Sequence, residues 1–513
     1  MMKRQQIQIQ PWFAAAVGSG ALLIFAFSPF DLFPIAWFAL VPLLYSLYGL
    51  NKQDAFRAGF LFGLSYFFGT IYWIYYSVHH YGGIPFVPSL LLIVLLCCYL
   101  ALYPAVFSVM FSSLLRRSHL PAMLIAPLFW TVGEFGRSYL LTGFPWSSLG
   151  YSQTRFLPMI QIADIVGIYG ISFLVMAVNG AVVDMLILRK RHSDRPLFAY
   201  LPTLAGAVLL GVSLIFSLVY GYWRLNQDRT AETVRVAVIQ GNIAQDKKWD
   251  PAFRHSVITI YQELTSSAVQ TAPQMIVWPE SAIPFVFERD IDYTEQLQAF
   301  QKRLDAYLLF GTILQRDPKQ PVFTNGAALL SKDGSLSYLY DKIHLVPFGE
   351  YVPLRQVLFF VDKLAYGIGD YVSGDSYIQA VTPFGSFPTL ICYEIIFPGL
   401  ARKFFVRGGD FLVTITNDAW FGTTNGPYQH FSMAVFRAIE NRKPVVRAAN
   451  SGISGFIDSN GRIGKTTELM TRTILVNDIK TDRTITFYTK YGDLFSFLCI
   501  ALSVILFFKK YNV

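Results

Sequence analysis

Long apolar runs constrain this chain more than any other feature of its sequence. About eight stretches of roughly 20 predominantly apolar residues are long enough to cross a bilayer as helices. They lie near residues 11–28, 32–50, 56–77, 88–115, 122–141, 160–188, 197–223 and 494–508. With 53% hydrophobic and only 15% charged residues, the composition is too apolar for a soluble enzyme. The chain is therefore predicted to be a polytopic α-helical membrane protein.

Basic residues are concentrated in the loops and tails on one side of these spans. Twelve of them lie there against Asp54 and Asp194, namely Lys3, Arg4, Lys52, Arg57, Arg116, Arg117, Arg189, Lys190, Arg191, Arg195, Lys509 and Lys510. Because cytoplasmic loops carry the excess of Lys and Arg, both termini are predicted to be cytoplasmic. These loops also account for the net charge of +9. The remainder is close to neutral, so nucleic acid is not expected as a partner.

The composition turns polar between about residues 226 and 490, a stretch that the same alternation places outside the cytoplasm. Short β-rich runs alternate there with helical patterns, which predicts one α/β domain with a sizeable core. Strands are expected at 234–240, 275–278, 307–314, 323–331, 389–392, 411–416 and 445–449, and helices at 253–269, 293–306 and 431–442. The predicted organisation is a bundle of about seven membrane helices in 1–225, this domain in 226–490 and a last membrane helix in 491–513.

Cys392 is the only thiol in the polar domain, and it follows a β-rich run. The other three cysteines, Cys97, Cys98 and Cys499, lie in apolar runs, where a cysteine is usually a small buried hydrophobe. A disulfide within the domain is therefore excluded for Cys392. It is either an inert buried thiol or a nucleophile.

Two further stretches carry charged side chains that suit work with a thiol. Glu280 follows the run at 275–278, at a strand end where α/β folds tend to place reactive groups. Alone, it could be a helix N-cap or a solvated loop acid. Lys342 is followed by apolar residues and by a second acid, Glu350. Alone, it could form a solvated salt bridge.

Taken together, the three local contexts resemble the Glu, Lys, Cys triad of the nitrilase superfamily, in the chain order which that superfamily uses. The resemblance covers roughly residues 234–479. It implies an α/β domain of the αββα kind, in which Glu280, Lys342 and Cys392 are the catalytic residues.

The membrane part narrows the resemblance to one branch, the apolipoprotein N-acyltransferase family, whose members carry this domain between a seventh and an eighth transmembrane helix. Further stretches resemble the family: Val238–Ile243 leading to Lys248-Trp249, Thr142–Trp146, Leu149–Gln153 and Ser28–Asp31. Ala244 departs from the pattern, where the family has a proline, but this position carries no reactive group. The resemblance also places Trp249 at the edge of the site.

The chemistry requires these residue types. A free thiol is mostly protonated at neutral pH, so a base must take its proton, and Glu280 is the candidate. Attack on an ester carbonyl builds an oxyanion, and Lys342 and the backbone amide of Tyr393 fit the role of stabilising it. Glu350 and Glu394 are expected close by, orienting Lys342 or relaying protons. A structural ion pair is an equally good interpretation of Glu394.

The resemblance implies a two-step transfer in the inner membrane of a Gram-negative bacterium, with the catalytic domain in the periplasm. A phospholipid, typically phosphatidylethanolamine, donates its sn-1 acyl chain to Cys392 as a thioester. The α-amino group of an N-terminal diacylglyceryl-cysteine of an apolipoprotein then attacks the thioester, in ping-pong kinetics. No cofactor or metal is expected, because the domain offers only His255, His344 and His430 without clustered Cys or His ligands.

Two other functions remain open at this level. A membrane-anchored amidase of the same superfamily would form the same acyl-enzyme and use water as acceptor. An eight-helix transporter with an inert external domain is disfavoured, because the apolar runs hold few ionisable residues: Glu134, Arg137, Asp164 and Asp184. Glu134 and Arg137 are three residues apart on a helix and could neutralise each other.

Several loops of the polar domain are unusually apolar for segments that face water. They are residues 346–353, 358–360 and 419–422. One hypothesis is that they form mobile arms that dip into the outer leaflet and cover the thioester. The alternative is that they pack on the domain core or on the membrane helices.

Overall fold

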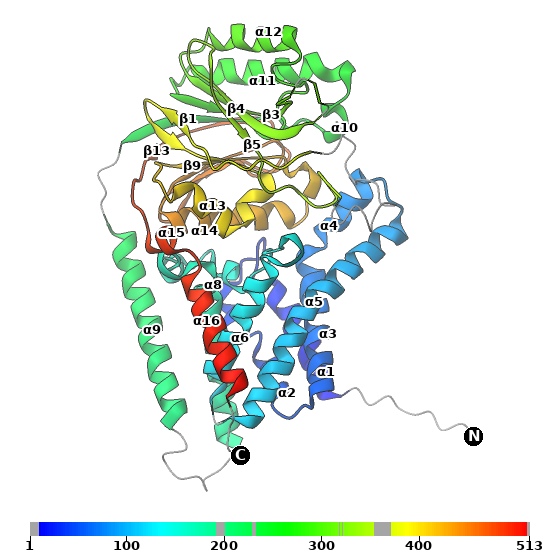
Figure 1. Ribbon diagram of the computed structural model, residues 1–513, viewed down its shortest axis with the longest axis vertical. Coiled ribbons are helices and arrows are strands. Elements are labelled where there is room, and N and C mark those ends of the chain that lie inside the picture. The colour runs from blue at the N-terminus through cyan, green and yellow to red at the C-terminus, as the bar shows by residue number, and fades with distance from the viewer. Residues whose placement is uncertain are drawn as a thin grey trace, which may run out of the picture. The chain divides into compact units, whose positions relative to one another are not determined.

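The computed structural model describes residues 10–118, 120–190, 201–227, 232–317, 319–320, 322–352 and 371–509. These residues divide into two compact units, traced in Figure 1. The first contains residues 10–72, 87–223 and 493–509, and the second contains 73–86 and 224–492, apart from the gaps given above. The second unit thus includes a short segment, residues 73–86, that comes from among the N-terminal helices.

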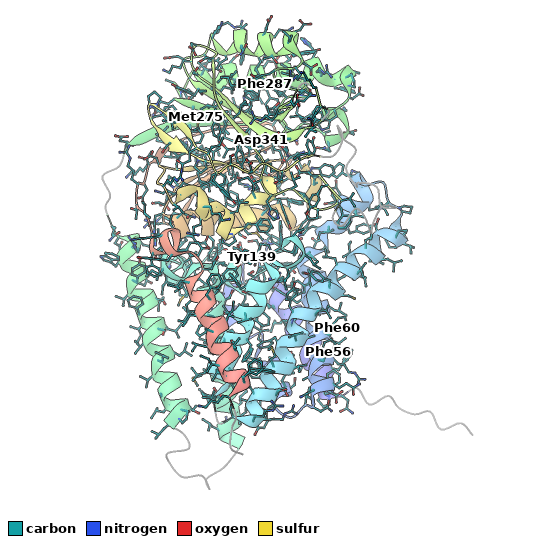
Figure 2. All side chains as sticks on the ribbon, viewed as in Figure 1. Phe56, Phe60, Tyr139, Met275, Phe287 and Asp341 are labelled. Atoms are coloured by element: carbon teal, nitrogen blue, oxygen red, sulfur yellow. The ribbon has the colours of Figure 1, made fainter. Side chains whose placement is uncertain are left out.

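The first unit is helical, as predicted. Its helices are α1 (Pro11–Ile24), η1 (Phe33–Trp37), α2 (Val41–Leu47), α3 (Lys52–Ile71), α5 (Phe86–Arg117), α6 (Ala122–Arg137), η3 (Leu140–Thr142), η4 (Leu149–Gln153), α7 (Leu157–Ile160), α8 (Ala163–Lys190), α9 (Leu201–Leu225) and α16 (Leu494–Phe508). Phe56 of α3 and Tyr139, both labelled in Figure 2, are exposed aromatic residues of this unit.

Three of the described helices, α5, α8 and α9, are long and apolar enough to cross a membrane by length and composition. Helix α3 makes a fourth if it is counted as one span with α4 (Trp73–Tyr76) and η2 (Ser77–Tyr81), beyond a bend of 54°. The apolar runs at 11–28, 32–50 and 494–508 form shorter apolar helices. The apolar helical character is confirmed, whereas the number of eight spans stays a prediction.

Small residues let the helices of this unit approach each other closely. A Cβ atom added at Gly63 of α3 would lie 2.7 Å from the Cα atom of Ala101 in α5. One added at Gly180 of α8 would lie 2.7 Å from the backbone oxygen of Ala122 in α6. Helices in a bilayer gain stability from such close backbone packing, because lipid tails are as apolar as leucine side chains.

Glu134 and Arg137, on α6, hold the loop that follows their helix. The Glu134 carboxylate accepts a hydrogen bond from the Leu149 amide at 2.6 Å. The Arg137 guanidinium donates to the Phe144 carbonyl at 3.1 Å and to the Ser148 hydroxyl at 3.3 Å. These two buried residues therefore give the loop at 144–149 a defined backbone path.

The second unit contains two large sheets and a two-stranded hairpin. The six-stranded sheet has the order β13-β1-β2-β3-β4-β5, and the five-stranded sheet has the order β12-β11-β10-β9-β8. The strands are β1 (Thr233–Gln240), β2 (Met275–Val277), β3 (Tyr307–Leu314), β4 (Thr324–Leu330), β5 (Leu336–Asp341), β6 (Ala380–Thr382), β7 (Gly385–Phe387), β8 (Thr389–Ile391), β9 (Leu412–Thr416), β10 (Val445–Ala449), β11 (Gly455–Ile457), β12 (Ile463–Thr466) and β13 (Thr473–Lys480). All seven predicted strands are present.

Helices cover the outer faces of the two sheets. Figure 1 shows α11 (Arg254–Val269) and α12 (Ile291–Gln301) on one outer face, and α13 (Pro398–Phe405) and α14 (Gly426–Asn441) on the opposite one. The remaining short helices of the unit are α10 (Gln245–Lys248), η6 (Pro251–Phe253), η7 (Cys392–Ile396), η8 (Asp418–Phe421) and α15 (Phe487–Tyr491). The layer order is that of the predicted αββα domain.

The strands in the middle of each sheet are parallel and buried on both faces. In the six-stranded sheet, β2 lies parallel to β1 and β3, and in the five-stranded sheet β9 lies parallel to β8 and β10. Met275, where β2 begins, and Phe287 are almost completely buried (Figure 2). Parallel strands buried on both faces read as continuous apolar runs, which is why the sequence located them. Their carboxyl ends are the places where reactive side chains are expected.

The segment at 73–86 belongs to the second unit because its aromatic residues pack on η8. The rings of Trp73 and Phe421 lie 4.6 Å apart, and those of Tyr81 and Trp420 lie 5.1 Å apart. The Ser77 hydroxyl donates a hydrogen bond of 2.6 Å to the Trp420 carbonyl. Sequence periodicity assigned this segment to the membrane part only, since it continues an apolar run.

Candidate active site

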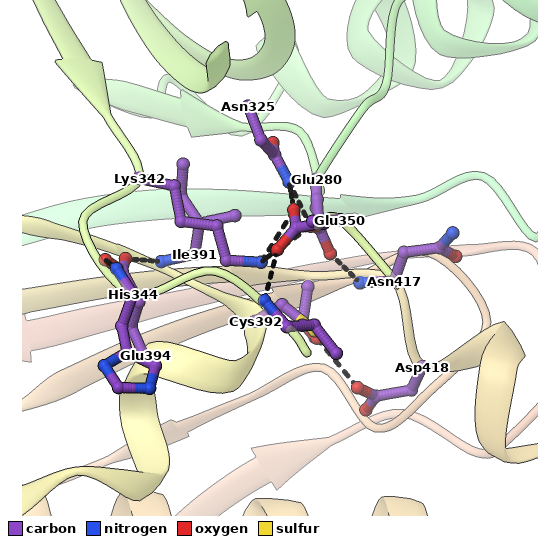
Figure 3. A network of polar contacts seen from close by, with 12 residues as sticks. Glu280, Asn325, Lys342, His344, Glu350, Ile391, Cys392, Glu394, Asn417 and Asp418 are labelled. Carbon is purple, nitrogen blue, oxygen red and sulfur yellow. Dashed lines mark hydrogen bonds and ion pairs between the residues drawn. The ribbon is translucent and has the colours of Figure 1, made fainter. Parts of the chain in front are cut away.

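Three strand ends bring the predicted catalytic residues together. Glu280 lies shortly after β2, and Lys342 directly follows β5, so both come from the six-stranded sheet. Cys392 directly follows β8, so it comes from the five-stranded sheet. In Figure 3 the three side chains converge between the two sheets. The site is therefore assembled by the packing of one sheet on the other.

Cys392 sits at a sharp strand-to-helix turn. Its φ angle is 52°, a left-handed value that is uncommon for a residue other than glycine. Such backbone strain persists only where the surroundings hold it. Burial raises the pKa of the Cys392 thiol well above its ordinary value, and the Glu280 carboxylate raises it further, against the opposing effect of Lys342. The resting thiol is therefore protonated and needs a base.

Lys342 is a buried ammonium held between two carboxylates. Its Nζ atom lies 2.9 Å from Glu350 Oε2 and 3.7 Å from Glu280 Oε1. Burial by itself would lower the pKa of Lys342, but the charges of Glu350 and Glu280 outweigh it and raise this pKa above its ordinary value. Lys342 therefore keeps its positive charge throughout the physiological pH range.

Amide groups fix the orientation of both carboxylates. The Asn325 side-chain amide donates to Glu280 Oε1 at 2.8 Å and to Glu350 Oε1 at 2.7 Å, so it bridges the two acids. The backbone amide of Asn417 donates to Glu280 Oε2 at 2.9 Å, and that of Val346 donates to Glu350 Oε2 at 2.7 Å. Figure 3 shows Glu280 and Glu350 side by side beneath Asn325. Hydrogen bonds to each oxygen let two acids share one buried cation.

Glu394 joins two segments of backbone. Its Oε1 atom accepts hydrogen bonds from the Tyr340 hydroxyl at 2.7 Å and from the amides of Ile343 at 2.8 Å and His344 at 3.1 Å. Its Oε2 atom accepts one of 2.7 Å from the Ile391 amide. Burial raises the pKa of Glu394 to about 7, although these bonds favour the charged form. The carboxylate thus ties the loop after β5 to the end of β8.

Tyr393 lies directly beside Cys392, whereas Trp249 lies at the end of helix α10. Tyr393 supplies the first backbone amide after Cys392, and its ring packs 5.1 Å from that of Phe397. Trp249 is half-buried and ends α10. Its neighbour Lys248 is the residue of this helix that reaches the triad, because its amine donates a hydrogen bond of 2.9 Å to the Glu280 backbone oxygen. Burial lowers the pKa of the Lys248 amine to about 8.

A second group of charged residues lies on the side of the five-stranded sheet. Asp418, His430 and Arg447 are completely buried. Arg447 Nη2 lies 2.7 Å from Asp418 Oδ2, and His430 Nδ1 lies 3.0 Å from Asp418 Oδ1. The other ring nitrogen of His430 lies 3.1 Å from the carbonyl oxygen of Cys392. This group, called the rear cluster below, contacts the backbone of Cys392.

Sequence reasoning missed the roles of Asn325, Lys248 and the rear cluster. One signal was available, because Asn325 and Arg447 interrupt strands whose other residues are all buried as well. A polar side chain inside a buried strand must find partners, so it marks a network. Asp418 and His430 give no comparable signal, since neither lies inside a strand. No group of three His, Cys, Asp or Glu side chains placed to hold a metal ion occurs among the described residues.

The structure decides between the two interpretations for one of the three apolar loops. Ala419 and Phe421 are 4% and 8% exposed, so the hypothesis of a mobile arm is wrong for them and the packed alternative holds. Phe348 is half-buried, and its amide donates a hydrogen bond of 2.7 Å to the Tyr351 carbonyl. Residues 358–360 lie outside the described part of the chain.

Comparison with known proteins identifies relatives along the whole chain. The family described as apolipoprotein N-acyltransferase N-terminal domain matches residues 19–181, and carbon-nitrogen hydrolase matches residues 235–488. The apolipoprotein N-acyltransferase of Geobacter metallireducens is 43% identical over 491 residues, which cover 95% of this chain and 92% of that protein. The one of Pasteurella multocida is 34% identical over 504 residues, covering 96% and 94%. Among solved structures, Saccharomyces cerevisiae Nit3 of the nitrilase superfamily aligns with 50% of this chain and 93% of its own, with 18% identity and a TM-score of 0.40.

Proposed function

Because the chain belongs to the apolipoprotein N-acyltransferase family, we propose that it moves an acyl chain from a phospholipid to the N-terminal amine of an apolipoprotein. The donor is the sn-1 ester of phosphatidylethanolamine, and the acceptor is the α-amino group of a diacylglyceryl-cysteine. The observation that carries this proposal is the buried ammonium of Lys342, shared by two carboxylates beside the lone thiol. These are the groups that acyl transfer through a thioester needs.

In the first step, Cys392 attacks the ester carbonyl. Glu280 takes the thiol proton as the sulfur–carbon bond forms, because the raised pKa of Cys392 keeps the proton on sulfur until then. The negative charge on the carbonyl oxygen is stabilised by the Lys342 ammonium and the Tyr393 amide. When the ester bond breaks, Glu280 returns the proton to the leaving alcohol, which departs as a lysophospholipid.

In the second step, the amine of the acceptor attacks the thioester. Glu280 accepts a proton from the attacking nitrogen as the nitrogen–carbon bond forms. The carbon–sulfur bond then breaks, and the proton passes from Glu280 to the Cys392 sulfur, which restores the resting thiol. Glu350 keeps Lys342 in place through both steps, and Asn325 holds both acids. Each residue thus ends the cycle in the protonation state in which it began.

The membrane arrangement follows from the charge pattern of the sequence. We propose eight transmembrane helices in the inner membrane, with both termini cytoplasmic and the domain at 226–490 in the periplasm. The domain boundaries are those expected above, with the membrane bundle in 1–225 and the last helix in 491–513. In this arrangement the catalytic domain faces the compartment in which exported apolipoproteins carry their lipid.

A membrane-anchored amidase is the second candidate, because it would form the same acyl-enzyme and release it to water. The long apolar helices α5, α8 and α9 favour transfer between lipids, since an anchored hydrolase of small amides needs no such membrane part.

Trapping of the acyl-enzyme separates the two functions. Detergent-purified protein is given phosphatidylethanolamine labelled in its sn-1 chain, quenched in denaturant and tested for hydroxylamine-labile label. We expect label on the wild type and on Cys97→Ala, a matched control in an apolar run, and none on Cys392→Ala. A diacylglyceryl-cysteinyl peptide should discharge the label quickly and water only slowly. An unlabelled wild type that hydrolyses a small amide instead would overturn the transferase proposal.

A further inference from the structure

The carbonyl oxygen of Cys392 has a specific partner behind the site. His430, on α14, is completely buried and places its Nε2 atom 3.1 Å from this oxygen. The contact crosses from a helix on the outer face of the domain to the turn at the end of β8. It therefore acts on the backbone of Cys392 itself, whose φ angle is left-handed.

The neighbours of His430 determine which ring nitrogen carries the proton. Arg447 Nη2 lies 3.0 Å from His430 Nδ1 and 2.7 Å from Asp418 Oδ2. The Cys392 carbonyl oxygen can only accept a hydrogen bond, so the Nε2 atom that faces it carries the proton, and Nδ1 then accepts from the Arg447 guanidinium, which can only donate. A second proton, shared with Asp418 Oδ1 at 3.0 Å, is opposed because burial and the Arg447 charge lower the pKa of His430. Neutral His430 thus donates from Nε2 to the Cys392 carbonyl.

The direction of this carbonyl also decides where the next amide points. The peptide between Cys392 and Tyr393 is trans, so its C=O and N–H bonds are rigidly coplanar and point in opposite directions. A hydrogen bond that holds the Cys392 oxygen toward α14 turns the Tyr393 N–H away from α14, toward the opposite side of the turn. That N–H is the backbone donor assigned above to the oxyanion.

We propose that His430 is a positioning residue that holds the Cys392–Tyr393 peptide so that the Tyr393 amide faces the oxyanion of both tetrahedral intermediates. The proposal deepens the function proposed above and rests on it. Arg447 and Asp418 act one step further back by fixing the His430 tautomer. The ring of Phe421 packs edge-on against the imidazole, with ring centres 5.6 Å apart at an angle of 90°.

Burial of the rear cluster supports a role beyond packing. Asp418 and Arg447 are withdrawn from water, and a buried ion pair of this kind is often no more stabilising than apolar residues of the same volume. The pair is thus poorly explained by stability alone. Control of a single tautomer explains why a charged donor and its counter-ion lie beside His430.

The experiment compares two amide replacements in the full-length protein. In His430→Gln the side-chain nitrogen reaches the place of Nε2, whereas in His430→Asn it reaches only the place of Nδ1. The rate of acyl-enzyme formation is measured in single turnovers with sn-1-labelled phosphatidylethanolamine, and the thermal midpoint is measured in the same detergent. Because misplacing one oxyanion donor costs about 100-fold, we expect this loss in His430→Asn and less than about 10-fold in His430→Gln. Discharge of the acyl-enzyme by the acceptor peptide should fall by the same factor.

Alkylation of Cys392 by iodoacetamide is the second measurement. This displacement consumes the thiolate but forms no oxyanion on a carbonyl. We expect His430→Asn to be alkylated at the rate of the wild type, while its acylation is slow. Alkylation that falls in parallel with acylation would mean that His430 acts on the thiol, and equal rates of acylation in both variants would mean that the Nε2 position is irrelevant. Either result would overturn the proposal.

Failure of the inference is distinguishable from failure of the proposed function. If the wild type itself forms no acyl-enzyme with the phospholipid, the acyltransfer function fails. If the wild type is acylated normally and His430→Asn is acylated at the same rate with an unchanged thermal midpoint, only the role of His430 fails.

Discussion

The two buried clusters on either side of Cys392 use charge in different ways. The front cluster, formed by Glu280, Lys342 and Glu350, surrounds an ammonium with two carboxylates and carries a net negative charge. The rear cluster pairs Asp418 with Arg447 around a neutral imidazole and is balanced. Side chains of the front cluster face the thiol, whereas the rear cluster contacts the backbone carbonyl of Cys392. The difference teaches that one cluster places charged side chains beside the thiol while the other holds the backbone behind it, which is the basis of the separate roles proposed above.

The largest loss of acylation rate is expected when the front cluster is disrupted. Lys342→Met removes the ammonium and leaves two like charges in contact, so one acid becomes protonated and no oxyanion cation remains. Acylation should slow by at least about 1000-fold, measured as the single-turnover rate. Lys332→Met, which removes an exposed lysine paired with Asp305, is the matched control and should retain full activity. Substantial activity in Lys342→Met would contradict the assigned role.

A smaller effect on rate, with a large one on stability, is expected from the rear cluster. Asp418→Asn leaves Arg447 as a buried charge without its carboxylate, which should lower the free energy of unfolding by about 3–5 kcal/mol. Acylation should fall only about 10-fold, because the His430 donor remains in reach. The checks are thermal unfolding and single-turnover acylation on one sample. A loss of rate without a loss of stability would show that the two clusters do not differ in the manner described.

Glu394 links the two sides, and its titration offers a pH test. The pKa of this acid rises from 4.5 to about 7 on folding. Between these values the native state binds more protons than the unfolded state, so this residue makes stability fall as the pH rises from 4.5 to 7. In Glu394→Gln that part of the pH dependence should disappear. This contribution of Glu394 is measured from thermal midpoints of the wild type and of Glu394→Gln across the pH range. The exposed Glu263→Gln variant is the control.

The smallest change in acylation rate is expected from substitutions where the segment at 73–86 contacts η8. Ser77→Ala removes one hydrogen bond to the Trp420 carbonyl, a part-buried contact worth about 1 kcal/mol. The acylation rate should stay within about twofold of the wild type, since the ring contacts of Trp73 and Tyr81 remain. A Trp73→Ala variant that also left both the rate and the thermal midpoint unchanged would argue against any influence of this segment on the rear cluster.

Local patterns located the parallel strands in the middle of both sheets, and the resemblance to the nitrilase superfamily singled out the three candidate catalytic residues. Glu280 and Cys392 follow β2 and β8, apolar runs that form buried parallel strands, whereas Lys342 follows β5, an antiparallel strand of alternating burial that was not predicted. Glu350 was also expected beside Lys342, eight positions away on the same loop. For Glu394 the pattern left an ion pair open, whereas the structure shows its oxygens bound mainly by backbone amides. Backbone partners leave no trace in side-chain patterns.

By itself, the sequence determined the apolar helical part, the α/β domain and the chemical type of the site, because hydrophobic periodicity and residue chemistry are local properties. Only the tertiary structure decided which distant groups meet around Cys392. His430 lies 38 positions away from it, and Asn417 lies 137 positions away from Glu280. The tertiary structure likewise placed residues 73–86 with the catalytic domain. These contacts form where the two sheets pack together and where helices pack on the sheets. The free energy of that packing depends on many distant segments at once, so no local pattern predicts it.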